Sequence, residues 1–486
     1  MSPQFDNSYA RLPDRFYARQ APVPVADPAL IRVNRPLANQ LGIDPDWLES
    51  AEGVRVIAGN FVPEGAEPIA TVYAGHQFGS WNPRLGDGRA ILLGEVIGSD
   101  GERYDLQLKG SGITPFSRMG DGRAPLGPVI REYLVSEAMA ALGVPTSRTL
   151  AAVTTGESVY RETRLDGGVL VRVAKSHIRI GTLQYFASKQ DFDALRQLAD
   201  YVIARHYPDA ADADNPVRAM FAQVLLRQAE LIARWQSLGF IHGVMNTDNM
   251  LLSGETIDYG PCAFMDGYDS AAVYSSIDHG GRYAYRNQPG IAHWNLACLA
   301  QTLLPLLADD EETATEIAQT ALDGFPELYA EAWFERLREK FGLAAMEAGD
   351  AELIQEFLDL LERGRVDFTL AFRRLAELAG PVSELGELFD FPESFADWLQ
   401  RWQQRCAQET GDSDSRQRRM MAVNPAFTAR NHLVEEAIAR AYEGDFAPFN
   451  RLLERLEKPY DYSTEDILLA TPPKPEQVVQ QTFCGT

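Results

Sequence analysis

The residues best suited to chemistry lie in two polar segments, FIHGVMNTDNMLL at 240–252 and IDYG at 257–260. Asn249 and Asp258 offer oxygen ligands of the kind that Mg²⁺ accepts while phosphates and water complete its octahedron. Asp248, next to Asn249, is a carboxylate that can act as a general base if it reaches an acceptor hydroxyl. We therefore expect metal-dependent phosphate chemistry here. The alternative is a polar β-hairpin that binds nothing.

The spacing in these segments is that of a protein-kinase catalytic loop. The interval from His242 to Asn249 equals that from His to Asn in H-R-D-L-x-x-x-N, and Asp258-Tyr-Gly stands where Asp-Phe-Gly would follow. His242 is expected to order the loop. The kinase's catalytic Asp is replaced by Val244, which cannot accept a proton. The spacing thus predicts a nucleotide site in which ordinary phosphoryl transfer is disfavoured.

A strand lysine and a helix glutamate form a second candidate pair. In YDLQLK, period-2 alternation puts Lys109 on the face opposite the apolar residues. Glu132 follows on the next predicted helix, as in kinases, where such a pair holds the lysine against nucleotide phosphates. A solvated surface lysine is the alternative reading, and Glu137 is a competing partner.

The sequence GDGRA occurs twice, at 86–90 and at 120–124. Its glycines permit close backbone approach, and its arginine suits phosphate oxygens. Arg172 and Arg179 add cations near these loops, so a local anion site is expected in an acidic chain. Two Asp-Gly turns and ordinary surface charges are the alternative.

Together, GDGR, LQLKGSG, MGDGRA, HGVMNTDN, IDYGP and a cysteine third from the C-terminus resemble the selenoprotein O family, also called YdiU. The resemblance covers nearly the whole chain. It implies a pseudokinase fold that binds ATP in a flipped orientation and transfers AMP to Ser, Thr or Tyr hydroxyls of proteins. Uridylyl transfer from UTP with Mn²⁺ is attributed to bacterial members and remains an alternative.

The resemblance also implies roles for single residues. Asp248 would accept the proton, and Asn249 and Asp258 would hold Mg²⁺ or Mn²⁺. The implied nucleotide-binding residues are Gly86, Gly88, Arg89, Lys109, Asp121, Gly122, Arg172, Arg179 and Asp258. Cys484 matches a selenocysteine of eukaryotic members, and we expect this tail thiol to reach Cys262 and gate the site by oxidation.

Two other functions compete with AMP transfer. A conventional phosphotransferase would carry a carboxylate at position 244, where valine stands. A catalytically dead nucleotide-binding scaffold would have lost its metal ligands, yet Asn249 and Asp258 are both present. AMP transfer is the function that we favour.

The surrounding periodicity predicts an α+β chain with a protein-kinase-like two-lobe fold. Strand patterns occur at 69–73, 89–98, 104–109 and 169–173, and one helix runs from Pro128 to Leu142. Helical patterns begin with a capping box at Ser188-x-x-Asp191 and continue from Pro216 to Gly239 and from 294 to 458. We divide the chain into an N-terminal extension that wraps the lobes (1–68), a kinase-like N-lobe (69–187), a helical C-lobe with the catalytic loop (188–470) and an extended tail with Cys484 (471–486).

Composition excludes several classes of protein. The 486 residues are 45% hydrophobic and 23% charged, which is typical of a folded chain. A net charge of -24 repels phosphate backbones and anionic lipids, so we expect neither nucleic acid nor membrane as a partner. No signal peptide or long apolar stretch is evident, and a cytoplasmic protein is expected. The separated cysteines argue against a zinc ribbon, and Cys262, Cys298 and Cys406 are expected to be buried thiols.

Overall fold

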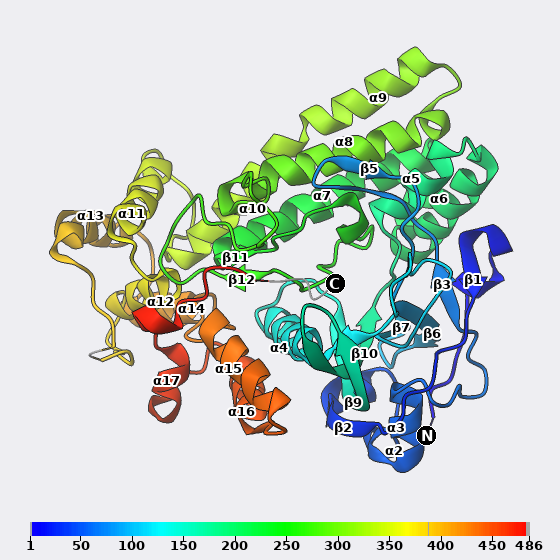
Figure 1. Cartoon of the computed structure of the whole chain (residues 1–486). Coiled ribbons are helices and arrows are strands. Elements are labelled where there is room, and N and C mark those ends of the chain that lie inside the picture. Colours follow the sequence, from blue (N-terminus) through cyan, green and yellow to red (C-terminus); the bar gives the residue numbers. More distant parts are fainter. Residues whose placement is uncertain (1, 387, 483–486) are drawn as a thin grey trace.

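The structure, a computed structural model, describes residues 2–386 and 388–482 and confirms a mixed α and β chain. Its centre is one antiparallel sheet with the strand order β1-β3-β6-β7-β10-β9-β2, and β8 pairs with β10 (Figure 1). The strands are β1 (Tyr17–Arg19), β2 (Ala29–Val33), β3 (Ile69–Thr71), β6 (Ala90–Ile97), β7 (Arg103–Lys109), β8 (Ala124–Pro125), β9 (Arg148–Tyr160) and β10 (Arg164–Ala174). The long strand β9 is absent from the sequence prediction.

Both faces of this sheet are covered, and strand β7 shows how. Leu106 and Leu108 belong to a hydrophobic cluster with residues of α1 (Arg35–Gln40), α2 (Pro45–Glu49) and α3 (Ala51–Ile57). Lys109 lies on the opposite face, toward α4 (Leu126–Ala141). The alternation predicted for β7 therefore separates a packed face from a charged one.

Helix α4 begins two residues before the predicted Pro128. Pro125 is its N-cap, and the chain turns directly from β8 into the helix. Its apolar side packs with Leu92, Ala152 and Leu170 of the sheet. Glu132 of α4 is only 2% exposed, so the helix holds a carboxylate inside the fold.

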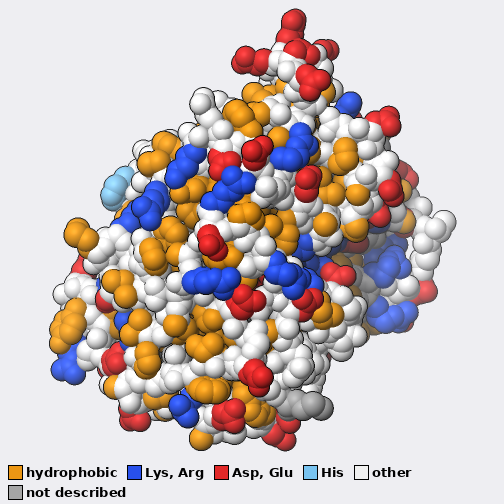
Figure 2. Space-filling model, turned by 90° about the vertical axis from the view of Figure 1, so that its right-hand side faces the viewer, with side chains coloured by type: hydrophobic (Ala, Val, Ile, Leu, Met, Phe, Trp, Pro, Cys, Tyr) orange, Lys and Arg blue, Asp and Glu red, His pale blue; other side chains and the backbone are white. Residues whose placement is uncertain are grey.

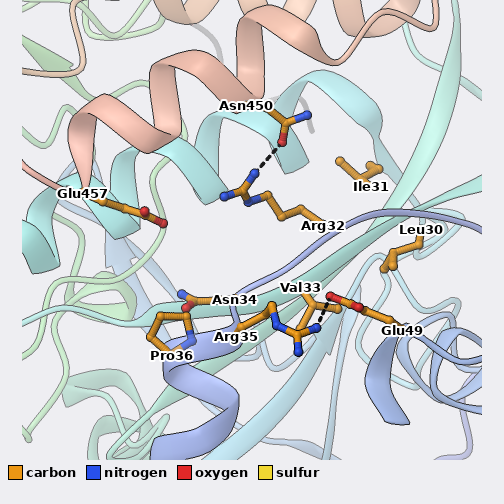
Figure 3. Close-up of a pocket in the computed structure, with 10 residues that line it drawn as sticks. All are labelled: Leu30, Ile31, Arg32, Val33, Asn34, Arg35, Pro36, Glu49, Asn450 and Glu457. Carbon is orange, nitrogen blue, oxygen red and sulfur yellow. Dashed lines mark hydrogen bonds and ion pairs between the residues drawn. The ribbon is translucent and has the colours of Figure 1, made fainter. Parts of the chain in front are cut away.

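The first 68 residues add strands to both edges of the sheet. Strand β1 pairs with β3, with Tyr17 opposite Thr71, and β2 pairs with β9, with Ala29 opposite Thr154. Next to β2, a pocket of about 420 Å³ lies against α16 (Ala447–Leu456), and Figure 3 shows its lining. Arg32 crosses this pocket and donates to Asn450 at 2.9 Å, which ties the N-terminal segment to a C-terminal helix.

Helices dominate the rest of the chain. Figure 1 shows α7, α8 and α9 running side by side across the top of the molecule. The helices of this region are α5 (Ile180–Ser188), α6 (Phe192–His206), α7 (Pro216–Ser237), α8 (Gln288–Leu307), α9 (Glu311–Asp323) and α10 (Phe325–Lys340). The predicted capping box is wrong, because Ser188 is the last residue of α5 and Asp191 alone caps α6, accepting from the Ala194 N–H at 3.1 Å.

A second hydrophobic cluster organises the C-terminal helices. Phe357, Trp398 and Trp402 are buried in it. It joins α11 (Asp350–Gly364), α12 (Phe368–Leu378), α13 (Ala396–Cys406) and α14 (Ser413–Met421), whereas α15 (Asn431–Tyr442) and α17 (Ile467–Ala470) pack in the cluster that contains α4. The segment 471–477 is extended only in part, since a 3₁₀ turn forms over Pro475–Gln477.

The surface carries charges of both signs. Figure 2 shows acidic, basic and apolar side chains interspersed on one face, with acidic side chains projecting at the top. In the part of the chain that the structure describes, no helix is long and apolar enough to cross a membrane.

Candidate active site

Two short strands and the buried ring of His242 hold the segment 242–249 in place. Strand β11 (Phe240–Ile241) pairs with β12 (Ala263–Phe264), so the residues between them form a closed loop. The ring of His242 stacks on Trp235 at 5.2 Å, and its Nε2 lies 2.8 Å from the carbonyl oxygen of Ile257. Burial lowers the pKa of His242. This histidine therefore orders the loop, as the sequence analysis expected.

Asp258 is the centre of the charged cluster. Its carboxylate accepts from Lys109 Nζ at 3.3 Å, from Arg172 at 2.6 Å and from Arg179 at 3.1 Å. Its φ of 66° lies in the left-handed region, which is uncommon for a residue other than glycine. Although burial opposes ionisation, the three cations hold the pKa of Asp258 well below its usual value. Asp258 is therefore a carboxylate aimed into a group of cations.

Glu132 neutralises two of the same cations from the other side. Its carboxylate accepts from Arg172 Nε at 2.7 Å and from Lys109 Nζ. Burial lowers the pKa of Lys109, and Arg172 beside it acts in the same direction. The alternative partner, Glu137, binds Arg148 and Asn34 instead. The structure thus forms the lysine–glutamate pair that the sequence analysis placed between β7 and α4.

Asp248 lies next to this cluster. Its main-chain oxygen accepts from Arg179 at 2.7 Å, and the same guanidinium nitrogen contacts Asp258, so Arg179 joins the two acidic segments. Oδ2 of Asp248 accepts from Gln77 Nε2 at 3.0 Å, whereas Oδ1 has no hydrogen-bond partner among the described residues. Burial raises the pKa of Asp248 to about 6. A buried carboxylate with one unpaired oxygen is suited to accept a proton.

Asn249 and Val244 complete the loop. Asn249 Nδ2 donates to the carbonyl oxygen of Val244 at 2.9 Å, which leaves the amide oxygen as the atom able to ligate a metal. Val244 itself is 5% exposed and packs as an apolar residue. One amide oxygen and the carboxylate of Asp258 are hard ligands that fit Mg²⁺ or Mn²⁺.

Both glycine-rich loops pack closely against the segment that lies between them in the sequence, 110–117. A Cβ atom at Gly86 would lie 2.4 Å from the Phe116 ring, and one at Gly122, whose φ is 69°, would lie 2.1 Å from the backbone of Gly112. Gly88 is equally confined, since a Cβ there would lie 2.9 Å from the Phe116 carbonyl oxygen. The carbonyl of Arg89 accepts from the N–H of Gly110, which joins the first loop to the end of β7.

Ion pairs separate the predicted site residues into two groups. In the first group, Lys109, Arg172 and Arg179 each form an ion pair with Asp258, and Arg89 lies on the first loop. Asp121 is exposed and pairs with Arg161 at 2.9 Å.

A hairpin that the sequence analysis missed closes over the catalytic loop. Strands β4 (Gly75–Gln77) and β5 (Ser80–Asn82) form it, and Gln77 contacts Asp248 from there. A Cβ at Gly75 would lie 2.7 Å from Asp248 Oδ1, so a larger residue there would have to displace the carboxylate. The signal in the sequence is the group of His76, Gln77, Phe78 and Trp81, which lies between Gly75 and the glycine-rich loop at 86–90.

The cysteines differ in their surroundings. Cys262 and Cys406 are buried as expected, whereas Cys298 is half-buried, because its helix α8 turns that position toward the surface. Cys484 lies outside the described residues. The described tail ends at Thr482, whose hydroxyl donates to the carbonyl of Pro261 at 2.7 Å, directly beside Cys262.

Comparison with known proteins identifies the family of the chain. A family model described as "Protein adenylyltransferase SelO" matches residues 1–457. A relative named "Protein nucleotidyltransferase YdiU" from Rhodopseudomonas palustris (strain BisB5) is 60% identical, and the match covers 99% of each chain. One of the same name from Bradyrhizobium sp. (strain ORS 278) is 58% identical, again over 99% of each chain.

Proposed function

The chain belongs to the SelO family of protein adenylyltransferases and is a protein nucleotidyltransferase, and we propose that it transfers AMP from ATP to Ser, Thr or Tyr hydroxyls of proteins. The observation that carries this proposal is the cluster of Lys109, Arg172 and Arg179 around Asp258, with Asp248 beside it. Such a cluster can bind a triphosphate, and Asp248 supplies a base next to it.

The proposal includes a kinase-like arrangement of the fold. The antiparallel sheet with α4 corresponds to an N-lobe, and the helices around α7 correspond to a C-lobe. The Lys109–Glu132 contact between β7 and α4 and the loop from His242 to Asp258 support this assignment. In this arrangement the nucleotide lies between the sheet and the loop.

Each residue of the site has its own role in the proposed reaction. Lys109, Arg172 and Arg179 would bind the phosphates, with Arg89 and the glycines of the two loops at the edge of the site. The oxygen of an acceptor hydroxyl attacks the α-phosphorus, Asp248 takes the hydroxyl proton, and the bond to pyrophosphate breaks. The cations stabilise the charge that develops on the departing pyrophosphate.

Asn249 and Asp258 would hold the divalent cation. Bound there, Mg²⁺ or Mn²⁺ supplies positive charge to the phosphate oxygens. Asp258 also keeps Arg172 and Arg179 in place, because it accepts hydrogen bonds from both. Its role therefore joins metal binding to the orientation of the phosphate-binding cations.

Val244 favours nucleotidyl transfer over conventional phosphoryl transfer. It is buried and apolar at the position where a kinase carries its base, whereas Asp248, in the same loop, has an oxygen without a hydrogen-bond partner in the described part of the chain. UTP remains a second donor, because the described contacts involve groups suited to phosphates, which the two nucleotides share.

We also propose that oxidation of the tail regulates the site. Thr482 is anchored to Pro261 and accepts from the Ser276 N–H, so the tail ends against the segment that follows Asp258. A disulfide between Cys484 and Cys262 would form from two thiols with loss of two electrons to an oxidant such as glutathione disulfide. It would restrain the segment 258–262.

Labelled nucleotides test the reaction. The chain is incubated with Mg²⁺, a nucleotide-free protein extract and ATP labelled at the α- or the γ-phosphorus, and α-labelled UTP is used in a parallel arm. AMP transfer predicts α-label on protein and no γ-label, and Asp248→Asn removes it while ATP affinity stays within about twofold. Incorporation of γ-label, or full activity of Asp248→Asn, would refute the mechanism.

A further inference from the structure

The hairpin of β4 and β5 links the catalytic loop to the surface. The His76 N–H donates to Thr247 Oγ1 at 2.8 Å, and the Phe78 N–H donates to Asn246 Oδ1 at 3.1 Å. Together with the contact from Gln77 to Asp248, these bonds fix the hairpin on the loop. Figure 1 shows the hairpin reaching away from the sheet toward α5 and α8.

Aromatic and cationic side chains gather where this hairpin meets α5 and α8. The His76 ring lies 4.8 Å from that of Trp81 and 5.3 Å from that of Trp294, which belongs to α8. The Arg282 guanidinium lies over the Trp294 ring at 4.6 Å. Trp81 and Trp294 are 39% and 36% exposed, although indole rings are usually covered. We name these four residues the hairpin face.

Arg282 lacks a carboxylate partner. Within residues 2–386 and 388–482 no Asp or Glu oxygen lies within ion-pair distance of it, and the nearby Asp278 accepts from the backbone N–H groups of Arg282 and Tyr283 instead. The chain has 69 acidic and 45 basic residues, so carboxylates outnumber the cations with which they can pair. An arginine stacked on an indole and unpaired with an acid is suited to bind a carboxylate from outside.

The position of the hairpin face identifies its ligand. Asp248 Oδ1 is unpaired, while Oδ2 is held by Gln77 of the hairpin itself. The hairpin therefore lies directly beside the carboxylate that an acceptor hydroxyl has to reach. A nucleobase is less well suited, because Arg282 and His76 already lie against the two indoles, and a base needs an open ring face to stack on.

We propose that the hairpin face binds the acceptor segment of the protein substrate, with Arg282 pairing with an Asp or Glu side chain near the modified hydroxyl and the indoles covering its apolar neighbours. This inference rests on the proposed function, because it assigns the surface next to the base to the acceptor. It identifies the substrate segment by its chemistry, as a hydroxyl residue flanked by a carboxylate.

The test uses two fluorescent peptides that are identical except for an Asp or a Lys two positions from a single Ser. Fluorescence anisotropy measures their binding to the full chain, and α-labelled ATP measures modification. We expect the Asp peptide to bind about fivefold more tightly, the range of a partly exposed ion pair. Arg282→Gln should abolish this preference and Arg282→Glu should reverse it, with the KM for ATP unchanged. Arg286→Glu is the matched control, because Arg286 is exposed four positions away and should leave the preference intact.

Three outcomes would overturn the inference. They are equal binding or no binding of the two peptides by the unmodified chain, an unchanged preference in Arg282→Glu, and a raised KM for ATP in Arg282→Glu with peptide binding unaltered. The last result would assign the face to the nucleotide. Charge-selective binding without incorporation of α-label would instead contradict the proposed function and leave the peptide site standing.

Discussion

Replacing Asp258 by Asn should destabilise the chain and make its stability depend on bound phosphate. The side chains of Lys109, Arg172 and Arg179 are 11%, 2% and 4% exposed, and all three contact Asp258. In Asp258→Asn, Glu132 remains as the counter-charge of Lys109 and Arg172, and Arg179 keeps Asp87 at 4.0 Å. Breaking a buried pair by removing one partner costs about 3–5 kcal/mol, and the half-buried position of Asp258 favours the lower end, about 3 kcal/mol.

The assay is thermal unfolding in EDTA with and without tripolyphosphate. Because the phosphates replace the lost negative charge, tripolyphosphate should raise the melting temperature of Asp258→Asn more than that of the unmodified chain. Calorimetry should show that Mg²⁺ no longer strengthens ATP binding. Asp269→Asn is the matched control, since Asp269 has the same 24% side-chain exposure but pairs with the exposed Arg365.

Melting of Asp258→Asn in EDTA at the temperature of the unmodified chain would contradict this prediction. Equal stabilisation of both proteins by tripolyphosphate would also contradict it. Either result would mean that the three cations do not depend on Asp258 for compensation.

Two further changes test the site and the core. Gly75→Ala should lower kcat at least tenfold with ATP affinity retained, because its Cβ would displace Asp248 Oδ1. Incorporation of α-label measures kcat, and isothermal calorimetry measures ATP affinity. An unchanged kcat would exclude the close approach of residue 75 to Asp248. Lys340 is buried against Phe372 without a carboxylate partner among the described residues, and burial lowers its pKa from 10.5 to about 7. Unfolding then takes up a proton between pH 7 and 10, so the free energy of unfolding should rise with pH over this range. In denaturation curves, Lys340→Met should be about 2–4 kcal/mol more stable than the unmodified chain at pH 7 and should lack this dependence on pH. A Lys340→Met chain that is less stable than the unmodified one would contradict this prediction.

Local spacing allowed much of the site to be predicted from the sequence. The interval from His242 to Asn249 lies within one loop, and the contact between Lys109 and Glu132 joins neighbouring elements. The contact between Gln77 and Asp248 spans 171 positions and leaves no periodic trace, so it could not be read from the pattern. Such contacts depend on the tertiary path of the chain.

In the fold, too, local patterns were predicted and long-range pairings were not. Strands β6 and β7 were predicted because apolar runs and alternation identify buried strands. The 13-residue strand β9 was missed, because its end, TTGESVY, has a polar composition typical of a turn. Similarly, nothing in the sequence of β1 or β2 indicates that both edges of the sheet are closed by the first 33 residues, since edge pairing depends on partners far along the chain.

The net charge predicts that the protein repels anions, whereas the side chains of the site predict that it binds them. The burial of these side chains explains the difference. A charge of -24 predicts repulsion of anions at long range, but this field is screened within about 10 Å in salt. Inside the site, Lys109, Arg172 and Arg179 pair with Glu132 and Asp258, and Arg179 also lies 4.0 Å from Asp87, so direct ion pairs hold these cations at fixed positions where a phosphate would meet them. An acidic protein can therefore bind a nucleotide, because nearby buried cations act on the phosphates more strongly than distant surface carboxylates.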